Sequence, residues 1–372
     1  MANKFILPKD KHDRIFENEI KNEYLRFVKS SNNPEVILLG GQAGSGKSTV
    51  SNEYAKNNFL VIDVDAYREF HPNHKQLTKE NPLTAAQLTH ADASLWATDV
   101  SRYVAKNKIS AVVETTFGSP ETVLEKAAIF QKENYNITAV VVSVPEKTSW
   151  LSVLKRFEEA YERDPKTARF VPQAQHDKQY RKITDTINEL YEKKLVSELK
   201  IVDRDQNPIF TDHFVNGAWQ LNKNPVTSLL EHRAKPFNEK QIKQHQKDWQ
   251  YVLSAMEKRN APAAEIFAAK VMQTHHENEF KNPNVARNLA IDPEYKANLM
   301  KNIETNILNK PLPDQVKLKL IGKVYNMAEM KIKIETKTIG DKLLDKKKQA
   351  IQQEIQTPKI KINRTETKDK TR

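Results

Sequence analysis

The chain has 372 residues, enough for about two domains, and its composition of 38% hydrophobic and 29% charged residues with 8 Gly and 17 Pro excludes collagen-like, low-complexity and membrane-protein classes. No apolar run approaches the roughly 18 residues of a spanning helix, and the first twenty residues are too charged for a signal peptide, so we expect a cytoplasmic protein without a membrane partner. Cysteine is absent, which excludes disulfides, thiolate nucleophiles and zinc–cysteine sites.

The formal charge of +12 is concentrated in the last third of the chain. Residues 231–372 contain 29 Lys and Arg against 18 Asp and Glu, whereas residues 1–230 contain 31 against 30. We therefore predict a first domain at residues 1–235 and a basic helical domain at 236–340. A charged tail follows at 341–372, with a composition typical of disorder.

Short apolar runs alternate with helical stretches along the first domain. After one expected helix at residues 10–29, the runs rich in Val, Ile and Leu are too short for helices and indicate buried parallel strands. They lie at residues 35–39, 59–64, 111–114 and 137–144, and the helical stretches between them lie at 47–56, 84–106 and 121–133. The alternation predicts a doubly wound, P-loop kinase-like α/β sheet, and prolines punctuate the helices predicted after residue 236.

A glycine-rich loop joins the first predicted strand to the next predicted helix. Residues 41–48 read Gly-Gln-Ala-Gly-Ser-Gly-Lys-Ser and fit the pattern G-x-x-x-x-G-K-[ST]. Backbone N–H groups of such a loop converge on phosphate oxygens, while Lys47 would reach the β- and γ-phosphates and Ser48 would ligate Mg²⁺. The alternative is a glycine-rich turn with an incidental lysine. The candidate nucleotide-binding residues are Gly41, Gln42, Ala43, Gly44, Ser45, Gly46, Lys47, Ser48 and Thr49.

Acidic residues lie at the carboxyl ends of the second and third predicted strands. Asp63 and Asp65 alternate at the carboxyl end of the second, where open α/β sheets bind ligands, and one carboxylate there could accept a hydroxyl proton. The alternative is a helix cap. Glu114 and Thr116 lie at the end of the third strand, and Asp99 lies in a helical stretch, where a solvated surface position is the alternative.

Two arginines flank a proline-containing loop further along the chain. Arg156 and Arg169 lie at the ends of a segment that resembles the mobile lid of nucleotide kinases, in which arginines neutralise the transferred phosphate. A surface helix with charged pairs is the alternative.

Together these motifs resemble the zeta toxins over residues 33–202. The resemblance rests on the loop at 41–48, Asp-Val-Asp-Ala-Tyr-Arg-Glu-Phe-His-Pro at 63–72, Glu-Thr-Thr at 114–116, the segment 156–169, and Pro172 with His176-Asp177. It implies an ATP-dependent kinase of a bacterial toxin–antitoxin system. Such kinases phosphorylate a sugar hydroxyl of UDP-N-acetylglucosamine or related UDP-sugars and block cell-wall precursor synthesis.

The resemblance also implies roles for individual residues. Lys47 and Ser48 would hold ATP and Mg²⁺, Asp65 would be the base, and Arg156 and Arg169 would stabilise the transferring phosphate. The sugar nucleotide would lie against Asp99, Glu114 and Thr116, whereas His71 is either adjacent to the substrate or structural, and His176 and Asp177 are either functional or a helix-start contact. Gly118 stands where the family typically has an arginine, so a broader acceptor range that includes NAD is an alternative.

The basic C-terminal region has no counterpart in compact members of the family. Its charge is compatible with a solvated surface, with nucleic-acid binding in a nucleic-acid-associated NTPase, or with helices that fold back on the kinase. The resemblance further implies a separate small helical antitoxin of the epsilon type, since residues 1–32 are too few for one.

Overall fold

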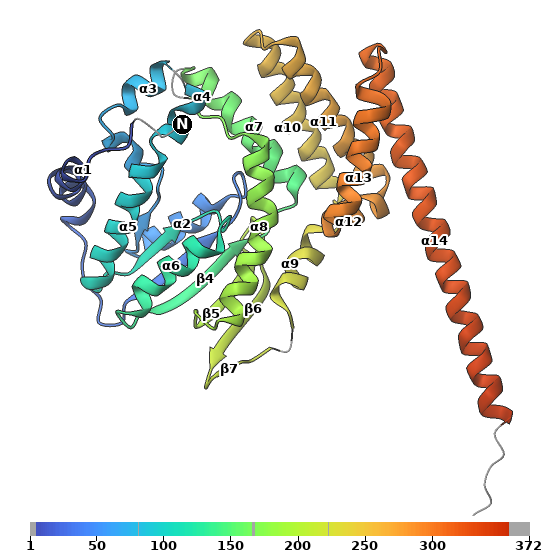
Figure 1. Cartoon of the computed structure of the whole chain (residues 1–372), viewed down its shortest axis with the longest axis horizontal. Coiled ribbons are helices and arrows are strands. Elements are labelled where there is room, and N and C mark those ends of the chain that lie inside the picture. The colour runs from blue at the N-terminus through green and yellow to red at the C-terminus, as the bar shows by residue number, and fades with distance from the viewer. Residues whose placement is uncertain (1–4, 81, 166–167, 222, 357–372) are drawn as a thin grey trace, which may run out of the picture.

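The structure is a computed structural model that describes residues 5–80, 82–165, 168–221 and 223–356. A seven-stranded sheet lies between helices, and a group of helices from the C-terminal region stands beside it (Figure 1). The predicted fold class, an α/β domain with a helical C-terminal region, is confirmed. No helix among the described residues combines the length and apolarity needed to cross a bilayer.

The sheet is mostly parallel, with an antiparallel end. Its order is β2-β3-β1-β4-β5-β6-β7, and β6 and β7 run antiparallel to their neighbours. The four predicted strands are present, and three further strands follow them that the sequence did not reveal. The bounds are β1 Glu35–Gly40, β2 Leu60–Ile62, β3 Ala111–Glu114, β4 Asn136–Val142, β5 Glu198–Val202, β6 Pro208–Val215 and β7 Ala218–Trp219.

The central strands are buried on both faces. Val36 and Leu38 of β1 belong to one apolar cluster, and Ile37 and Leu39 belong to another on the opposite face. Successive side chains of a strand point to opposite faces, so both must be apolar when helices cover the two sides. This explains why the strands appear in the sequence as unbroken apolar runs.

The part of the chain before residue 236, our predicted first domain, contains helices on both sides of the sheet. The predicted helix at 10–29 forms as a short α-helix that continues into a π-helix, and the stretch at 84–106 divides into two helices at Thr89. The bounds are α1 Lys9–Ile15, η1 Phe16–Leu25, α2 Lys47–Lys56, η2 Ala66–Phe70, α3 His74–Glu80, α4 Pro82–Leu88, α5 His90–Lys106, α6 Pro120–Gln131, α7 Glu146–Arg163, α8 Gln173–Glu192 and α9 Pro225–Arg233.

The remaining helices form what we call the appendage, residues 236–356. Pro283 and Pro293 begin two of its helices, a position where the missing N–H of proline costs nothing. The bounds are α10 Glu239–Lys258, α11 Ala263–Lys281, α12 Pro283–Ile291, α13 Pro293–Ile303, η3 Glu304–Leu308 and α14 Asp314–Gln356. Residues 341–356 of the predicted tail continue α14, which extends away from the body in Figure 1, and residues 357–372 lie outside the described residues.

The appendage packs against the first domain through α7. Trp150 and Leu154 of α7 share a buried cluster with Trp249 and Val252 of α10. Ion pairs surround this contact, among them Lys155 with Asp248 at 2.7 Å and Lys147 with Glu279 at 2.9 Å. The C-terminal helices therefore fold back on the domain that carries the candidate site.

Candidate active site

The glycine-rich loop turns sharply between β1 and α2. Gly44 and Gly46 have φ values of +74° and +95°, a region that favours glycine. At Gly44 a Cβ would also stand 2.1 Å from the carbonyl oxygen of Ser149 on α7. The Lys47 ammonium lies back along the loop and donates to the carbonyls of Gly41 at 2.6 Å and Gln42 at 3.3 Å.

Features of this loop fit a bound triphosphate. Helix α2 begins at Lys47 without a side-chain cap, so no loop side chain competes with an anion for its first N–H groups, although the Thr49 N–H donates to the Gly46 carbonyl at 3.1 Å. The Ser45 hydroxyl is buried and has no hydrogen-bond partner in the described part of the chain. Ser48 and Thr49 are exposed on the first turn of α2, so the Ser48 hydroxyl is open to a metal ion carried by the nucleotide.

Three charged groups meet beside the loop. Burial lowers the pKa of Lys47, and the nearby charges of Glu114 and Asp63 oppose that effect. Burial raises the pKa of Glu114, and burial together with the neighbouring Asp65 raises the pKa of Asp63. A buried cation within the electrostatic influence of acids whose pKa values are raised is an arrangement common at functional sites.

Asp65 lies between two guanidinium groups. Its Oδ1 accepts from Arg68 Nε at 2.9 Å, and its Oδ2 pairs with Arg169. Burial works to raise the pKa of Asp65, but the charges of Arg169 and then Arg68 outweigh it and hold the pKa below its usual range. The carboxylate is therefore ionised at neutral pH.

The predicted lid arginines lie near this carboxylate. Arg156 is exposed on α7, and the charges of Arg169 and Asp65 act on it. Arg169 follows α7 in the loop, and its Nε is buried without a partner within the described ranges. Residues 166 and 167 of the predicted lid lie outside the described residues. The structure thus gathers Lys47, Asp65, Glu114, Arg156 and Arg169.

Other predicted residues have contacts elsewhere. Asp99 of α5 contacts His12 Nε2 at 3.2 Å and Arg102 at 2.9 Å. His71 is buried, and its Nε2 lies 3.0 Å from the carbonyl of Phe5, which favours the structural alternative. The Thr116 hydroxyl accepts from the Gly118 N–H at 3.3 Å, so it shapes the turn after β3.

Two arginines of the site were missed by the sequence analysis. Arg68 is buried, donates to Asp65 and lies three residues after it, a spacing that could have indicated it. Arg204 follows β5 and donates to the Gly44 carbonyl and to Ser152 Oγ, the latter at 2.9 Å. Since β5 was not predicted, nothing placed Arg204 at the ligand-binding edge of the sheet.

Comparison with known proteins points to one family. The family model for zeta toxin matches residues 19–213. A zeta toxin from Streptococcus pyogenes is 27% identical over 199 residues, which cover 52% of this chain and 69% of that protein. The toxin PezT from Streptococcus pneumoniae serotype 4 is 27% identical over 188 residues, covering 50% and 74%. A solved structure from the PezAT chromosomal toxin–antitoxin system of Streptococcus pneumoniae superposes with a TM-score of 0.58 at 20% identity, covering 69% of this chain and 100% of the other.

Proposed function

The chain belongs to the zeta toxin family, and we propose that it is an ATP-dependent kinase that phosphorylates a sugar hydroxyl of UDP-N-acetylglucosamine or a related UDP-sugar. The observation that carries the proposal is the placement of Asp65 between Arg68 and Arg169 at the carboxyl edge of the sheet. A base beside the phosphate-binding loop, with cations around it, is what phosphoryl transfer to an alcohol requires.

The proposed chemistry assigns one task to each group. Bound ATP with Mg²⁺ supplies the phosphoryl group. Lys47 and the N–H groups of the loop would hold the phosphates, and the Ser48 hydroxyl would ligate the Mg²⁺. Asp65 accepts the proton of the sugar hydroxyl as its oxygen bonds to the γ-phosphorus and ADP leaves, while Arg156 and Arg169 neutralise charge on the phosphoryl oxygens.

The pairing of Asp65 with Arg169 supports a mechanism in which bound ATP increases the basicity of Asp65. While the pair is intact, the pKa of Asp65 is held low, which makes it a weak base. When Arg169 turns to the phosphoryl oxygens, Asp65 loses one of its two cations and its pKa rises. The same movement would then stabilise the phosphate and strengthen the base.

The test is an acceptor screen by mass spectrometry. We expect ATP and UDP-N-acetylglucosamine to give ADP and a product that is heavier by one phosphoryl group. Asp65→Asn should lower turnover by about 10²–10⁴-fold, the usual contribution of a general base. As a control, Asp10→Asn removes an exposed carboxylate of α1 and should leave turnover unchanged.

Related acceptors separate the alternatives. If NAD but not UDP-sugars gave a phosphorylated product, the proposed acceptor would be wrong and the proposed kinase activity would stand. Absence of any phosphorylated product, or near-normal turnover by Asp65→Asn, would refute the proposed activity or the proposed base.

We also propose a protein partner, a small helical antitoxin that blocks the nucleotide site. The family, and the relative solved from a toxin–antitoxin system, support it. Expression of the chain alone should arrest growth of a bacterial host, and the Asp65→Asn chain should not. A candidate antitoxin should restore growth and co-purify with the chain; toxicity that persists with Asp65→Asn would contradict the link between kinase activity and arrest.

A further inference from the structure

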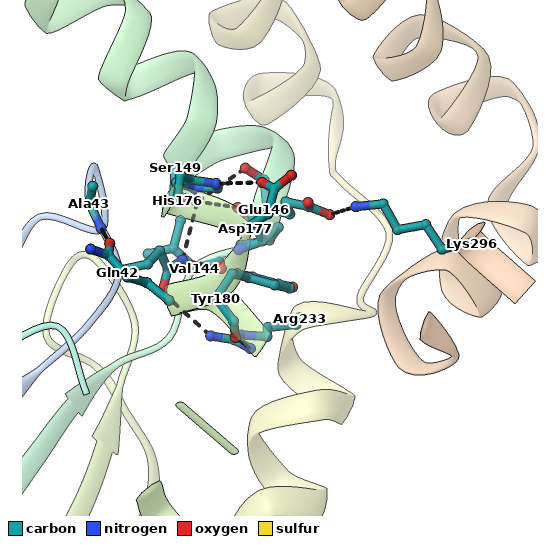
Figure 2. Close-up of polar contacts among 12 residues, drawn as sticks. Gln42, Ala43, Val144, Glu146, Ser149, His176, Asp177, Tyr180, Arg233 and Lys296 are labelled. Carbon is teal, nitrogen blue, oxygen red and sulfur yellow. Dashed lines mark hydrogen bonds and ion pairs between the residues drawn. The ribbon is translucent and has the colours of Figure 1, made fainter. Parts of the chain in front are cut away.

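A buried polar network lies beneath the phosphate-binding loop (Figure 2). The Gln42 amide nitrogen is 3.1 Å from the Val144 carbonyl and 3.2 Å from Ser149 Oγ. Ser149 Oγ is 2.9 Å from His176 Nε2, and His176 Nδ1 is 2.9 Å from a carboxylate oxygen of Asp177. Gln42, Ser149 and His176 each have a relative exposure of 0%.

The direction of each hydrogen bond follows from its partners. A carboxylate only accepts hydrogen bonds, so the contact with Asp177 selects the tautomer of the His176 imidazole that carries its proton on Nδ1. Nε2 of that tautomer accepts a hydrogen bond from the Ser149 hydroxyl, for which the Glu146 carbonyl at 3.0 Å is a second acceptor. The Ser149 oxygen in turn accepts from the Gln42 amide. The chain of bonds fixes which way the Gln42 amide faces.

The other side of Gln42 is held as well. Its carbonyl oxygen accepts from Arg233 Nη2 at 3.4 Å, and Arg233 is buried over the ring of Tyr180, 3.8 Å from its centroid. The N–H of Ala43 donates to Gln179 of α8 at 3.2 Å. Two consecutive loop residues are therefore fixed from below by side chains of α7, α8 and α9.

The appendage covers the outer end of the network. Lys296 of α13 forms an ion pair with Glu146, the first residue of α7. The backbone carbonyl of Glu146 is 3.0 Å from Ser149 Oγ, and the charge of Asp177 also acts on Lys296. Figure 2 shows Lys296 reaching across from the appendage to this end of α7.

Ser149, His176 and Asp177 resemble the serine, histidine and acid of a hydrolase. Their surroundings, however, exclude nucleophilic catalysis by Ser149. Ser149 Oγ is fully buried and faces Gln42, so no substrate carbonyl can approach it. What the network touches is the loop that binds phosphate.

We propose that His176 is a positioning residue of the nucleotide site: through Ser149 it orients Gln42, and so holds the phosphate-binding loop in its binding shape before the nucleotide arrives. This rests on the proposed function for its ligand, ATP. A loop already held in shape loses less entropy on binding, so the network should act on affinity for ATP. Lys296 of the appendage stabilises the same network through its ion pair with Glu146 at the start of α7.

The experiment measures ATP affinity and loop rigidity separately, on the full chain. Calorimetric titration with ATP should show about tenfold weaker binding for Ser149→Ala and for His176→Leu, the effect of one lost buried hydrogen bond. His176→Gln should bind like the wild type, because its amide oxygen can accept the Ser149 proton. Amide hydrogen exchange without nucleotide should be faster at residues 41–47 in the two weakened variants.

Ser101→Ala is the matched control. Ser101 is fully buried on α5, where its hydroxyl bonds back to Ala97 at 2.7 Å. Loss of the Ser101 hydroxyl should change neither the affinity for ATP nor the hydrogen exchange of residues 41–47. Lys296→Met should raise loop exchange to a smaller extent.

The outcomes separate this proposal from the kinase proposal. ATP affinity within twofold of the wild type together with unchanged exchange in Ser149→Ala would overturn the positioning role, even if the variant were less stable. If the wild type binds no ATP, the proposed function fails, and the exchange measurement still decides the role of the network. If His176→Leu does not fold, Ser149→Ala carries the test.

Discussion

The contact between Arg259 and Glu158 should be a main support of the appendage. Arg259 follows α10 and donates to both carboxylate oxygens of Glu158 on α7, at 2.8 and 3.0 Å, and it also pairs with Glu265. The Glu158 side chain is 1% exposed and that of Arg259 is 13% exposed. Arg259→Leu would leave the Glu158 carboxylate buried without its cation.

The magnitude follows from the burial of the pair. Removing one partner of a buried ion pair typically costs about 3–5 kcal/mol, and the partial exposure of Arg259 places this case near the lower figure. We therefore expect the free energy of unfolding to fall by about 3 kcal/mol, a large part of the stability of an ordinary domain. Urea denaturation, followed by tryptophan fluorescence, measures it, because Trp249 and Trp150 lie in this interface.

A neighbouring residue provides the control. Lys258→Met removes an exposed cation that pairs with Glu162 at 3.2 Å on the same two helices, and it should not change stability measurably. The double variant Glu158→Leu with Arg259→Leu should recover most of the loss, since apolar side chains can replace a buried pair. If Arg259→Leu were as stable as Lys258→Met, the carboxylate would be hydrated and the reasoning wrong.

Three further predictions concern the nucleotide site. Gly44→Ala should abolish ATP binding in a titration because its Cβ would overlap the Ser149 carbonyl, whereas Gly217→Ala, with a φ of +83° and open space around it, should cost only about 1–2 kcal/mol of backbone strain and bind ATP normally; equal binding by both variants would contradict the close contact. Arg204→Met should weaken ATP binding about tenfold by freeing the Gly44 carbonyl, and unchanged binding would show that the loop holds its shape without it. Burial raises the pKa of Glu114 in the folded state, so its contribution to stability is fully present below the unfolded pKa of about 4.3 and is lost as the pH rises through the folded pKa. The free energy of unfolding of Glu114→Gln should therefore equal that of the wild type near pH 4 and exceed it at pH 7.5. A lower free energy of unfolding for the variant at pH 7.5 would contradict the expected destabilisation by ionised Glu114.

The parts of the site that the sequence revealed are those that depend on short stretches of chain. The loop at 41–48 must have its glycines and lysine at fixed spacing, and Asp65 must directly follow a buried strand. Neither requirement involves a distant residue. The same holds for the central strands, because burial on both faces leaves a continuous apolar run.

The parts that the sequence did not reveal depend on packing between distant segments. His176 is 134 positions beyond Gln42 along the chain, and Ser149 reaches both only because α7 and α8 lie together beneath the loop. From sequence alone, a contact at a helix start was the favoured interpretation of His176. The strands β6 and β7 were missed for a different reason. Strand β6 is only partly buried and lacks the apolar run that identifies a central strand in the sequence.

The appendage is joined to α7 by ion pairs that composition could not reveal. Three of its cations, Lys258, Arg259 and Lys296, pair with acids of α7. In the other direction, Lys147 and Lys155 of α7 pair with Glu279 and Asp248 of the appendage, so these contacts consume charge of both signs and offset little of the net positive charge of the appendage. Because α7 also carries Arg156 and Ser149, the same ion pairs brace the helix that supports both the lid arginine and the phosphate-binding loop. For this reason we expect substitutions that break these ion pairs to weaken nucleotide binding, even where they leave any separate binding activity of the appendage unchanged.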